Sequence, residues 1–201
     1  FREQGVDVAL ANWRGVFAPP GVSAAGRDAM VSLMEAMTKS AAWQEECKKR
    51  DWTSIPIFGD AGRMNDNYTR DLKENLDAVL DAVVDAGFVD RDKMGLGGHS
   101  YGAFSTVNAL SLMPNFKAGI AGDGMYNRTL TPFGFQSERR NFYQAQDTYL
   151  DMSPFLRADK IAGALLLYHA IEDQNQGTDP ISSRRMFLAL QGLGKQAALY
   201  M

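Results

Sequence analysis

Residues 98–102 form the pentapeptide GHSYG, within the longer stretch GLGGHSYGAF. A G-x-S-x-G pattern is typical of a tight strand-to-helix turn that presents a serine hydroxyl above a sheet. It predicts that Ser100 is a nucleophile that attacks a carbonyl carbon, and that the backbone N–H of Tyr101 is one oxyanion-hole donor. The alternative at this point is an ordinary glycine-rich turn.

A serine nucleophile normally works with a histidine base and an acid that orients the base. The candidate acid is Asp173, which follows an apolar run and lies 73 residues beyond Ser100; Asp123 and Glu172 are weaker alternatives. The chain has two histidines. His99 adjoins the serine on a tight turn, so we expect its side chain to diverge from the hydroxyl. His169 lies at the end of a predicted strand, where we expect a packed or hydrogen-bonded side chain, and no lysine has a spacing that recommends it as the base.

The composition excludes several classes of function. The chain has 201 residues, 45% of them hydrophobic, and a net charge of −3. Its overall electrostatic field therefore does not favour binding to nucleic acid or to an anionic membrane. The single cysteine, Cys47, excludes an internal disulfide, and we expect no metal and no cofactor because the histidines and the thiol show no metal-ligand spacing. The longest apolar run, residues 162–168, is much shorter than a membrane span. A periplasmic or a cytoplasmic location stays open, and the first residue, Phe1, predicts a processed product or a fragment.

The order of elements after residue 67 predicts an α/β fold. Helices and strands alternate there, with one irregular segment over residues 125–160, and such alternation favours a parallel sheet with flanking helices. Helices are predicted at 72–84, 101–112 and 180–193, and strands at 93–97, 116–121, 162–169 and 196–201. The apolar run at 162–169 is of the kind found in a strand covered on both faces. Because ligands of such sheets bind at the carboxyl ends of the strands, we expect Ser100, Asp123 and Asp173 at one edge.

From about residue 55 to residue 201 the chain resembles the catalytic domain of prolyl-oligopeptidase-family serine peptidases, most of all the glutamyl-endopeptidase-like branch. The matching stretches include MNDNY, GLGGHSYGAF, GDGMYNRTLTPFGFQSERR and YHAIEDQNQGTDPISSRRMF. The resemblance implies a partial α/β-hydrolase fold, a peptide substrate, Ser100 as nucleophile and Asp173 as acid. Ala170 stands where such enzymes usually have glycine. If the glutamyl-type resemblance holds, Arg128, Arg139 and Arg140 are candidates for binding an acidic side chain of the substrate. The alternative is that they are solvated surface charges.

The resemblance also implies that the family's histidine lies on a loop just past residue 201, so we expect the isolated chain to hydrolyse peptides at or near background. The first strands of the hydrolase sheet and the β-propeller of complete family members are expected to be missing as well. A sheet without those strands exposes an apolar edge, which predicts self-association.

Residues 1–52 resemble a different family, the C-terminal end of tripartite tricarboxylate transporter receptors, which are periplasmic solute-binding proteins. The matching words are EQGVDVALANWRGVFAPPG and SAAWQEECKKRDWT. The sequence therefore predicts two parts, a receptor-like segment at 1–54 that begins with a strand over 6–17 and a truncated hydrolase domain at 55–201. Two alternative functions follow: a carboxylate-binding receptor fragment, with Arg14 as a ligand contact or a surface residue, and a non-catalytic remnant of a gene fusion.

Overall fold

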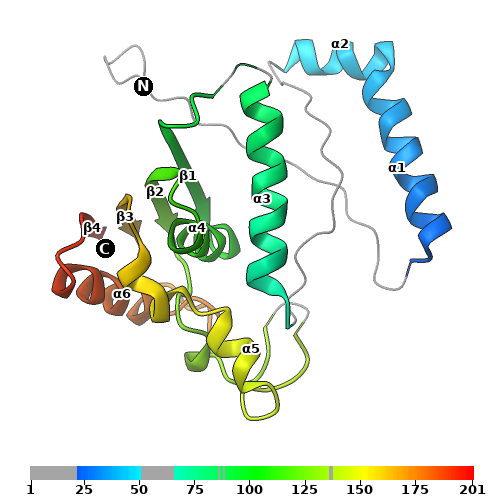
Figure 1. Ribbon diagram of the computed structural model, residues 1–201. Helices are drawn as coiled ribbons and strands as arrows, with labels where there is room; N and C mark the ends of the chain where they lie inside the picture. The colour runs from blue at the N-terminus through cyan, green and yellow to red at the C-terminus, as the bar shows by residue number, and fades with distance from the viewer. Residues whose placement is uncertain (1–21, 51–65, 86, 88, 136–137) are drawn as a thin grey trace. The chain divides into compact units, whose positions relative to one another are not determined.

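The computed structural model describes residues 22–50, 66–85, 87, 89–135 and 138–201 (Figure 1). The chain divides into two compact units, residues 1–59 and 60–201. The strand predicted over 6–17, Arg14 and the predicted boundary at 54/55 lie outside the described residues. None of the described helices is long and apolar enough to cross a membrane.

The first unit contributes two described helices, α1 (Ala24–Lys39) and α2 (Ala41–Lys49). Each begins at a serine N-cap, because a hydroxyl oxygen satisfies a backbone N–H that has no partner within the helix. The Ser23 hydroxyl accepts from the Gly26 N–H at 3.1 Å, and the Ser40 hydroxyl accepts from the Trp43 N–H at 3.2 Å. The buried Cys47 lies on α2.

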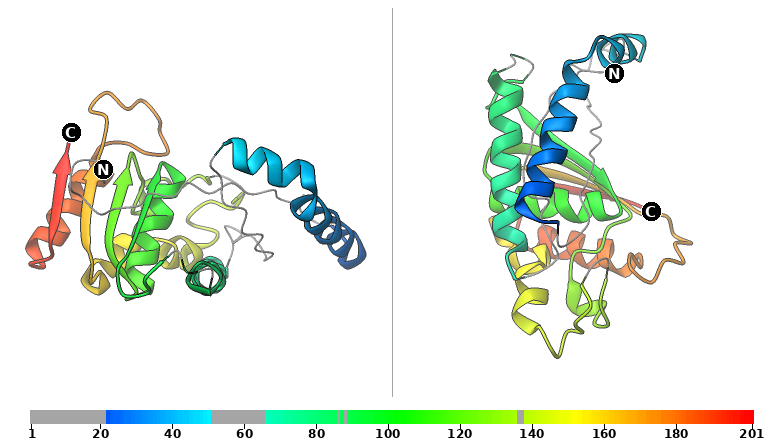
Figure 2. Two further views of the ribbon diagram at one scale, coloured as in Figure 1. Left: turned by 90° about the horizontal axis from the view of Figure 1, so that it is seen from above. Right: turned by 90° about the vertical axis from the view of Figure 1, so that its right-hand side faces the viewer.

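A four-stranded parallel sheet forms the centre of the second unit, as the alternation of elements predicted. Its strands lie in the order β1 (Met94–His99), β2 (Phe116–Gly122), β3 (Ala164–Tyr168) and β4 (Ala197–Tyr200). All three pairings are parallel. The left view in Figure 2 shows the strand arrows pointing the same way, so their carboxyl ends share one edge.

Helices connect the strands and cover the sheet. The segment between β1 and β2 is α4 (Tyr101–Leu112), and the segment between β3 and β4 is α6 (Ile181–Gly192). The predicted irregular segment between β2 and β3 contains three short helices: η2 (Arg128–Leu130), α5 (Gln146–Asp151) and η3 (Pro154–Lys160). The helix predicted at 72–84 is longer than expected and forms α3 (Tyr68–Asp85), which packs against α4 and α5.

The described helices bury one face of the sheet. Leu165 and Leu167 of β3 are buried in the main core, and Gly119 of β2 has no side chain, which lets Leu110 of α4 approach. A Cβ at Gly119 would lie 2.9 Å from Leu110 Cδ2. On the opposite face, Ile120 and Tyr168 keep 37% and 39% of their surface exposed. The expectation that strand 162–169 is covered on both faces is therefore wrong for the described residues.

Candidate active site

Ser100 stands between the last residue of β1 and the first residue of α4, where the sequence pattern predicted a tight turn. Its N–H donates to Gly122 O at 2.8 Å, which extends the ladder with β2 by one residue, and its carbonyl accepts from the Phe104 N–H at 3.1 Å, which starts the helix. The backbone at Ser100 makes both hydrogen bonds with φ 55° and ψ −114°. A serine at positive φ is strained by about 1–3 kcal/mol, a kind of strain that clusters at functional sites.

The two glycines of the pentapeptide contribute differently. A Cβ at Gly98 would lie 2.3 Å from the carbonyl carbon of Gly102 and 2.4 Å from its oxygen, so the turn closes only because residue 98 has no side chain. A Cβ at Gly102 would meet nothing within 4 Å. The close approach across the turn therefore requires glycine at the first position of the motif, whereas the last position has room for a side chain.

We expect the strain at Ser100 to be measurable. Ser100→Gly should raise the free energy of unfolding by about 1 kcal/mol, because glycine adopts positive φ without a steric penalty and the gain exceeds its extra chain entropy. Ser100→Ala keeps the Cβ and should change stability by less than about 0.5 kcal/mol. Urea unfolding followed by far-ultraviolet circular dichroism measures both, and a Ser100→Gly chain less stable than the Ser100→Ala chain would contradict the strain.

The first backbone N–H groups of α4 face the same edge of the sheet as Ser100. Tyr101 is the first residue of α4, so its N–H has no carbonyl within the helix to bind. None of the described residues accepts from it. A donor without a partner at a helix N-terminus, adjacent to the serine, is suited to a developing oxyanion.

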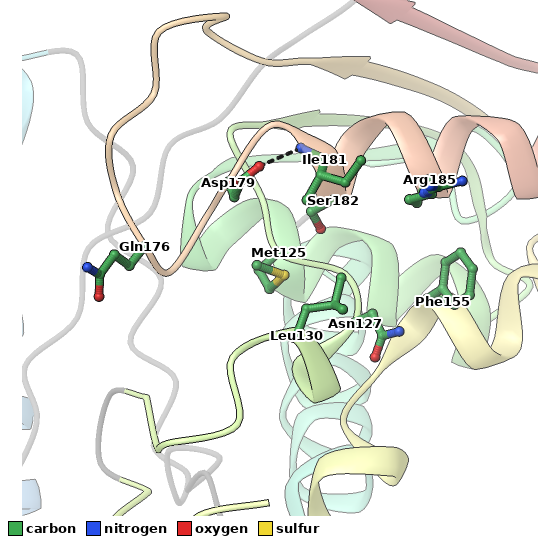
Figure 3. A pocket seen from close by; sticks show the side chains of 9 residues that line it. All are labelled: Met125, Asn127, Leu130, Phe155, Gln176, Asp179, Ile181, Ser182 and Arg185. Atoms are coloured by element: carbon green, nitrogen blue, oxygen red, sulfur yellow. Dashed lines mark hydrogen bonds between the residues drawn. The ribbon is translucent and has the colours of Figure 1, made fainter.

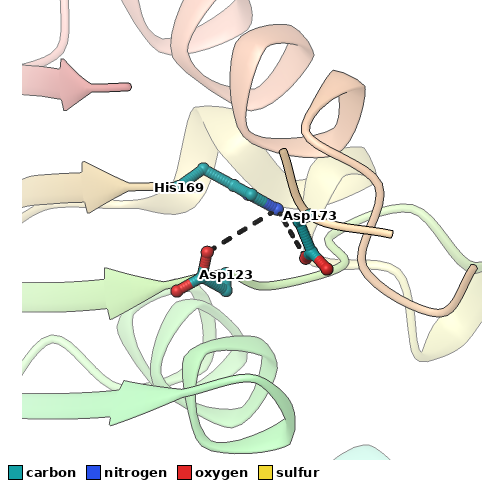
Figure 4. A group of neighbouring side chains, drawn as sticks. All are labelled: Asp123, His169 and Asp173. Carbon is teal, nitrogen blue, oxygen red and sulfur yellow. Dashed lines mark hydrogen bonds and ion pairs between the residues drawn. The ribbon is translucent and has the colours of Figure 1, made fainter. Parts of the chain in front are cut away.

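Asp173 follows β3 and lies beside His169 (Figure 4). Three donors hold its carboxylate. The Asn175 N–H donates to Oδ1 at 2.9 Å, the Thr178 hydroxyl donates to Oδ2 at 2.7 Å, and His169 Nε2 lies 3.1 Å from Oδ2. Ionised carboxylates accept about four hydrogen bonds, so one site on Oδ1 stays available. An imidazole N–H could donate a hydrogen bond to that site.

These contacts lower the pKa of the Asp173 carboxyl below its ordinary value; the largest cause is the hydrogen bond from Thr178, followed by the Asn175 N–H. A folded-state pKa below the unfolded value stabilises the fold above the unfolded pKa. That contribution is lost as the pH falls through the folded-state pKa. Asp173 is therefore an anion across the neutral range, as an acid that orients a histidine must be.

His169 is fully buried and is used within the fold. Its Nδ1 lies 2.7 Å from Ser183 Oγ on α6, and its Nε2 contacts Asp173 as described above. A neutral ring with its proton on Nε2 satisfies both contacts, because it accepts from the serine and donates to the carboxylate. This matches the expectation of a hydrogen-bonded, packed histidine.

His99 diverges from Ser100, as the tight turn led us to expect. Its exposed ring places Nδ1 3.2 Å from Asp123 Oδ2. Asp123 itself has φ 49° and accepts from the Ala170 N–H at 2.7 Å. Among the described residues, neither histidine is hydrogen-bonded to the Ser100 hydroxyl.

The weaker acid candidates have different surroundings. Asp123 links the ends of β1, β2 and β3 through His99 and Ala170. Glu172 is exposed, and its backbone carbonyl accepts from the Gln174 side chain at 3.5 Å. Neither is held by side-chain hydroxyls as Asp173 is.

The sequence did not predict the cluster of Asp123, His169 and Asp173, in which Asp123 is distant in sequence from the other two and these are four residues apart. One potential metal-ligand atom from each lies within 4.8 Å of the others, so the three side chains have the donor types and spacing for a divalent ion. The hydrogen bond between His169 and Asp173, with those from Ala170 to Asp123 and from Thr178 to Asp173, already accounts for the geometry.

The three candidate arginines lie in different environments. Arg139 is exposed. Arg140 donates to Glu138 at 2.9 Å and to Asp66 at 3.0 Å, and these hydrogen bonds raise the pKa of its guanidinium. Arg128 is 5% exposed and lies between the rings of Phe104 and Phe135, and burial lowers its pKa to about 10.

A pocket of about 640 Å³ opens beside this edge of the sheet (Figure 3). Its walls come from the segment after β2, including Met125 and Asn127, and from the loop and helix after β3, including Gln176, Asp179 and Arg185. Ser100, Asp173 and Arg128 do not line it. The pocket shares the loops of the site but does not contain the candidate reacting atoms.

Comparison with known proteins places residues 58–201 in a family. These residues match the family described as "Prolyl oligopeptidase family". A protein of Arabidopsis thaliana called "Probable glutamyl endopeptidase, chloroplastic" is 48% identical over 143 residues, which cover 70% of this chain and 15% of the relative. One of the same description from Oryza sativa subsp. japonica is 47% identical over 148 residues, covering 73% and 16%. The chain thus spans less than a fifth of the length of these relatives.

Solved structures agree on the fold. The acylaminoacyl peptidase of Pyrococcus horikoshii superposes with a TM-score of 0.57 at 25% identity, covering 69% of this chain and 24% of that protein. Dipeptidyl peptidase 4 of Porphyromonas gingivalis gives a TM-score of 0.57 at 23% identity, covering 66% and 19%, and supports the fold alone. The expectation of an α/β-hydrolase sheet is confirmed.

Proposed function

This chain belongs to the prolyl oligopeptidase family, and from that premise we propose that it carries the nucleophile and the acid of a serine peptidase that hydrolyses peptide bonds by acyl transfer. Ser100 is the proposed nucleophile and Asp173 the proposed acid. The observation that carries the proposal is the backbone at Ser100, held at φ 55° between a strand and a helix by a turn that admits no side chain at Gly98.

The proposed reaction follows from the groups at this edge of the sheet. Ser100 Oγ attacks the scissile carbonyl carbon while a base takes the hydroxyl proton, and the Tyr101 N–H stabilises the oxyanion. The tetrahedral intermediate then expels the amine, which receives that proton, and leaves an acyl ester on Ser100. Water, deprotonated by the same base, hydrolyses the ester and regenerates the serine. Asp173 accepts an N–H from the base through its remaining site on Oδ1.

We propose that this base comes from outside the 201 residues. The chain has only two histidines, and both are engaged elsewhere: His169 with Ser183 and Asp173, His99 with Asp123. The short span of the chain relative to its relatives supports this proposal.

Labelling with a fluorophosphonate and added imidazole tests the function. We expect slow labelling of Ser100 in the chain alone and a marked acceleration by imidazole, because free imidazole replaces the missing base. Ser100→Ala should abolish the label, and Asp173→Asn should weaken the acceleration, since an amide offers the imidazole a poorer partner. Mass spectrometry locates the label.

Two outcomes would contradict parts of the proposal. Labels spread evenly over the serines of the chain, with or without imidazole, would argue against Ser100 as a nucleophile. Rapid labelling of Ser100 without imidazole would argue against a base from outside the chain.

We further propose that the substrate carries an acidic side chain. The support is the name of the two plant relatives, glutamyl endopeptidase, together with the three candidate arginines that follow β2. The receptor-like assignment of residues 1–52 stays a prediction, as do the non-catalytic alternative and self-association through the sheet edge.

A further inference from the structure

Arg128 is a buried cation with no anion beside it among the described residues. It is 5% exposed, and its Nε has no hydrogen-bond partner among those residues. Within the part of the chain that the structure describes, no carboxylate forms an ion pair with its guanidinium, whereas Arg140, 12 residues later, has two. Burying an unpaired charge is costly, and buried charges in proteins are normally paired. An arginine in this state has hydrogen-bonding capacity that the described fold does not use.

Aromatic rings compensate part of that cost. The guanidinium carbon lies 3.9 Å from the ring centroid of Phe135 and 4.4 Å from that of Phe104. Tyr68 packs on Phe104 with ring centroids 5.3 Å apart, and Tyr101 does so at 5.5 Å. Contacts of this kind stabilise a desolvated cation, and they act on its faces. The N–H groups point outward in the plane of the guanidinium, where a carboxylate binds with two parallel hydrogen bonds.

The guanidinium lies beside the helix that begins at the candidate nucleophile. Phe104, whose ring it contacts, is one turn beyond Ser100, and its N–H donates to the Ser100 carbonyl at 3.1 Å. Four residues of helix correspond to about 6 Å along the axis. Tyr101, adjacent to the serine, packs on the same Phe104 ring with ring centroids 5.5 Å apart. A substrate side chain that extends from the bond attacked by Ser100 towards α4 would therefore approach this cation.

The other two arginines are less suited to this role. Arg140 already donates from Nε and Nη2 to Glu138 and from Nη2 to Asp66, so a substrate carboxylate would compete with two carboxylates for this guanidinium. Arg139 is exposed, where solvent screens an ion pair and leaves it little binding energy.

We propose that Arg128 is the specificity-determining residue of the site at Ser100, and that its guanidinium binds the side-chain carboxylate of an acidic residue, glutamate above all, in the peptide substrate. The proposal deepens the peptidase function above and rests on it for the position of the substrate. An uncharged side chain of the same length, such as glutamine, would leave the cation unpaired, so the site should reject it.

The test measures binding, which does not depend on turnover. The Ser100→Ala chain is titrated, with detection by NMR, with two acetylated and amidated peptides that differ only in glutamate or glutamine. We expect the glutamate peptide to bind at least tenfold more tightly. Arg128→Gln and Arg128→Lys should abolish or sharply reduce the preference, because neither keeps the planar fork. The matched control, Arg139→Gln, should keep it.

The outcomes separate this inference from the peptidase function. Equal affinity for the two peptides in the chain with Arg128 intact would overturn the inference, even where fluorophosphonate labels Ser100. A glutamate preference that survives Arg128→Lys would overturn it as well. A preference that depends on Arg128, together with no labelling of Ser100, would support the carboxylate site and contradict the peptidase proposal. If Arg128→Gln does not fold, Arg128→Lys and the comparison of the two peptides decide the question.

Discussion

Replacing Gly98 with alanine is expected to lower the free energy of unfolding by at least about 3 kcal/mol, a large part of the stability of an ordinary domain. The added Cβ would lie 2.3 Å from a backbone carbon of Gly102, and no side-chain rotation relieves a clash with backbone. The β1–α4 turn would have to open, and the N–H···O bond from Ser100 to Gly122 would lengthen with it.

Gly102→Ala is the matched control, since the same methyl group is added four residues away on the same turn. Its Cβ meets nothing within 4 Å, and alanine is favoured over glycine within a helix, so we expect a gain of about 0.5–1 kcal/mol. Urea unfolding of the two variants, with hydrogen exchange of the β1 and α4 amides, measures the contrast. Equal stability of the two variants would show that the turn is not closed as described.

Peptide hydrolysis by the 201-residue chain is expected to be the same as by its Ser100→Ala variant. Removing a member of a catalytic triad lowers turnover on the order of a million-fold, and neither histidine of this chain is free to act as base on Ser100. A set of quenched fluorescent peptides, with the glutamate peptide among them, provides the measurement. Turnover that depends on Ser100 would contradict the proposal that the base comes from outside the chain.

An intact strand-to-helix turn at Ser100, found together with background turnover, would separate the positioning of the reacting groups from the supply of the base. Strain at Ser100, the position of the Tyr101 N–H and the ionised Asp173 are properties of the folded sheet edge and do not need the base. Chemical rescue of labelling therefore tests whether these groups are positioned for catalysis, while peptide turnover tests whether the chain is sufficient for it.

Local patterns explain why much of this structure was predictable. The period of the apolar residues predicted α3, and the alternation of helices with apolar runs predicted the parallel sheet, which the comparisons confirm. The turn at Ser100 was predicted because its glycine lies two residues from the serine, within a segment short enough for sterics alone to dictate the conformation. The bounds of α3 were less accurate, because Tyr68 joins the helix through packing on Phe104 and not through the periodic pattern.

By itself, then, the sequence determined the order of the elements, the position of the strand-to-helix turn and, since parallel strands end at one edge, the neighbourhood of Ser100, Asp123 and Asp173. Only the tertiary structure decided which charges are compensated. Arg140 is paired with Glu138, two residues away, and with Asp66, a carboxylate 74 positions distant in sequence that only the fold brings close. Arg128 is enclosed by rings from Phe104 and Phe135 and meets no carboxylate among the described residues. Compensation of charge depends on distances through space, and a linear pattern of residue types does not contain those distances.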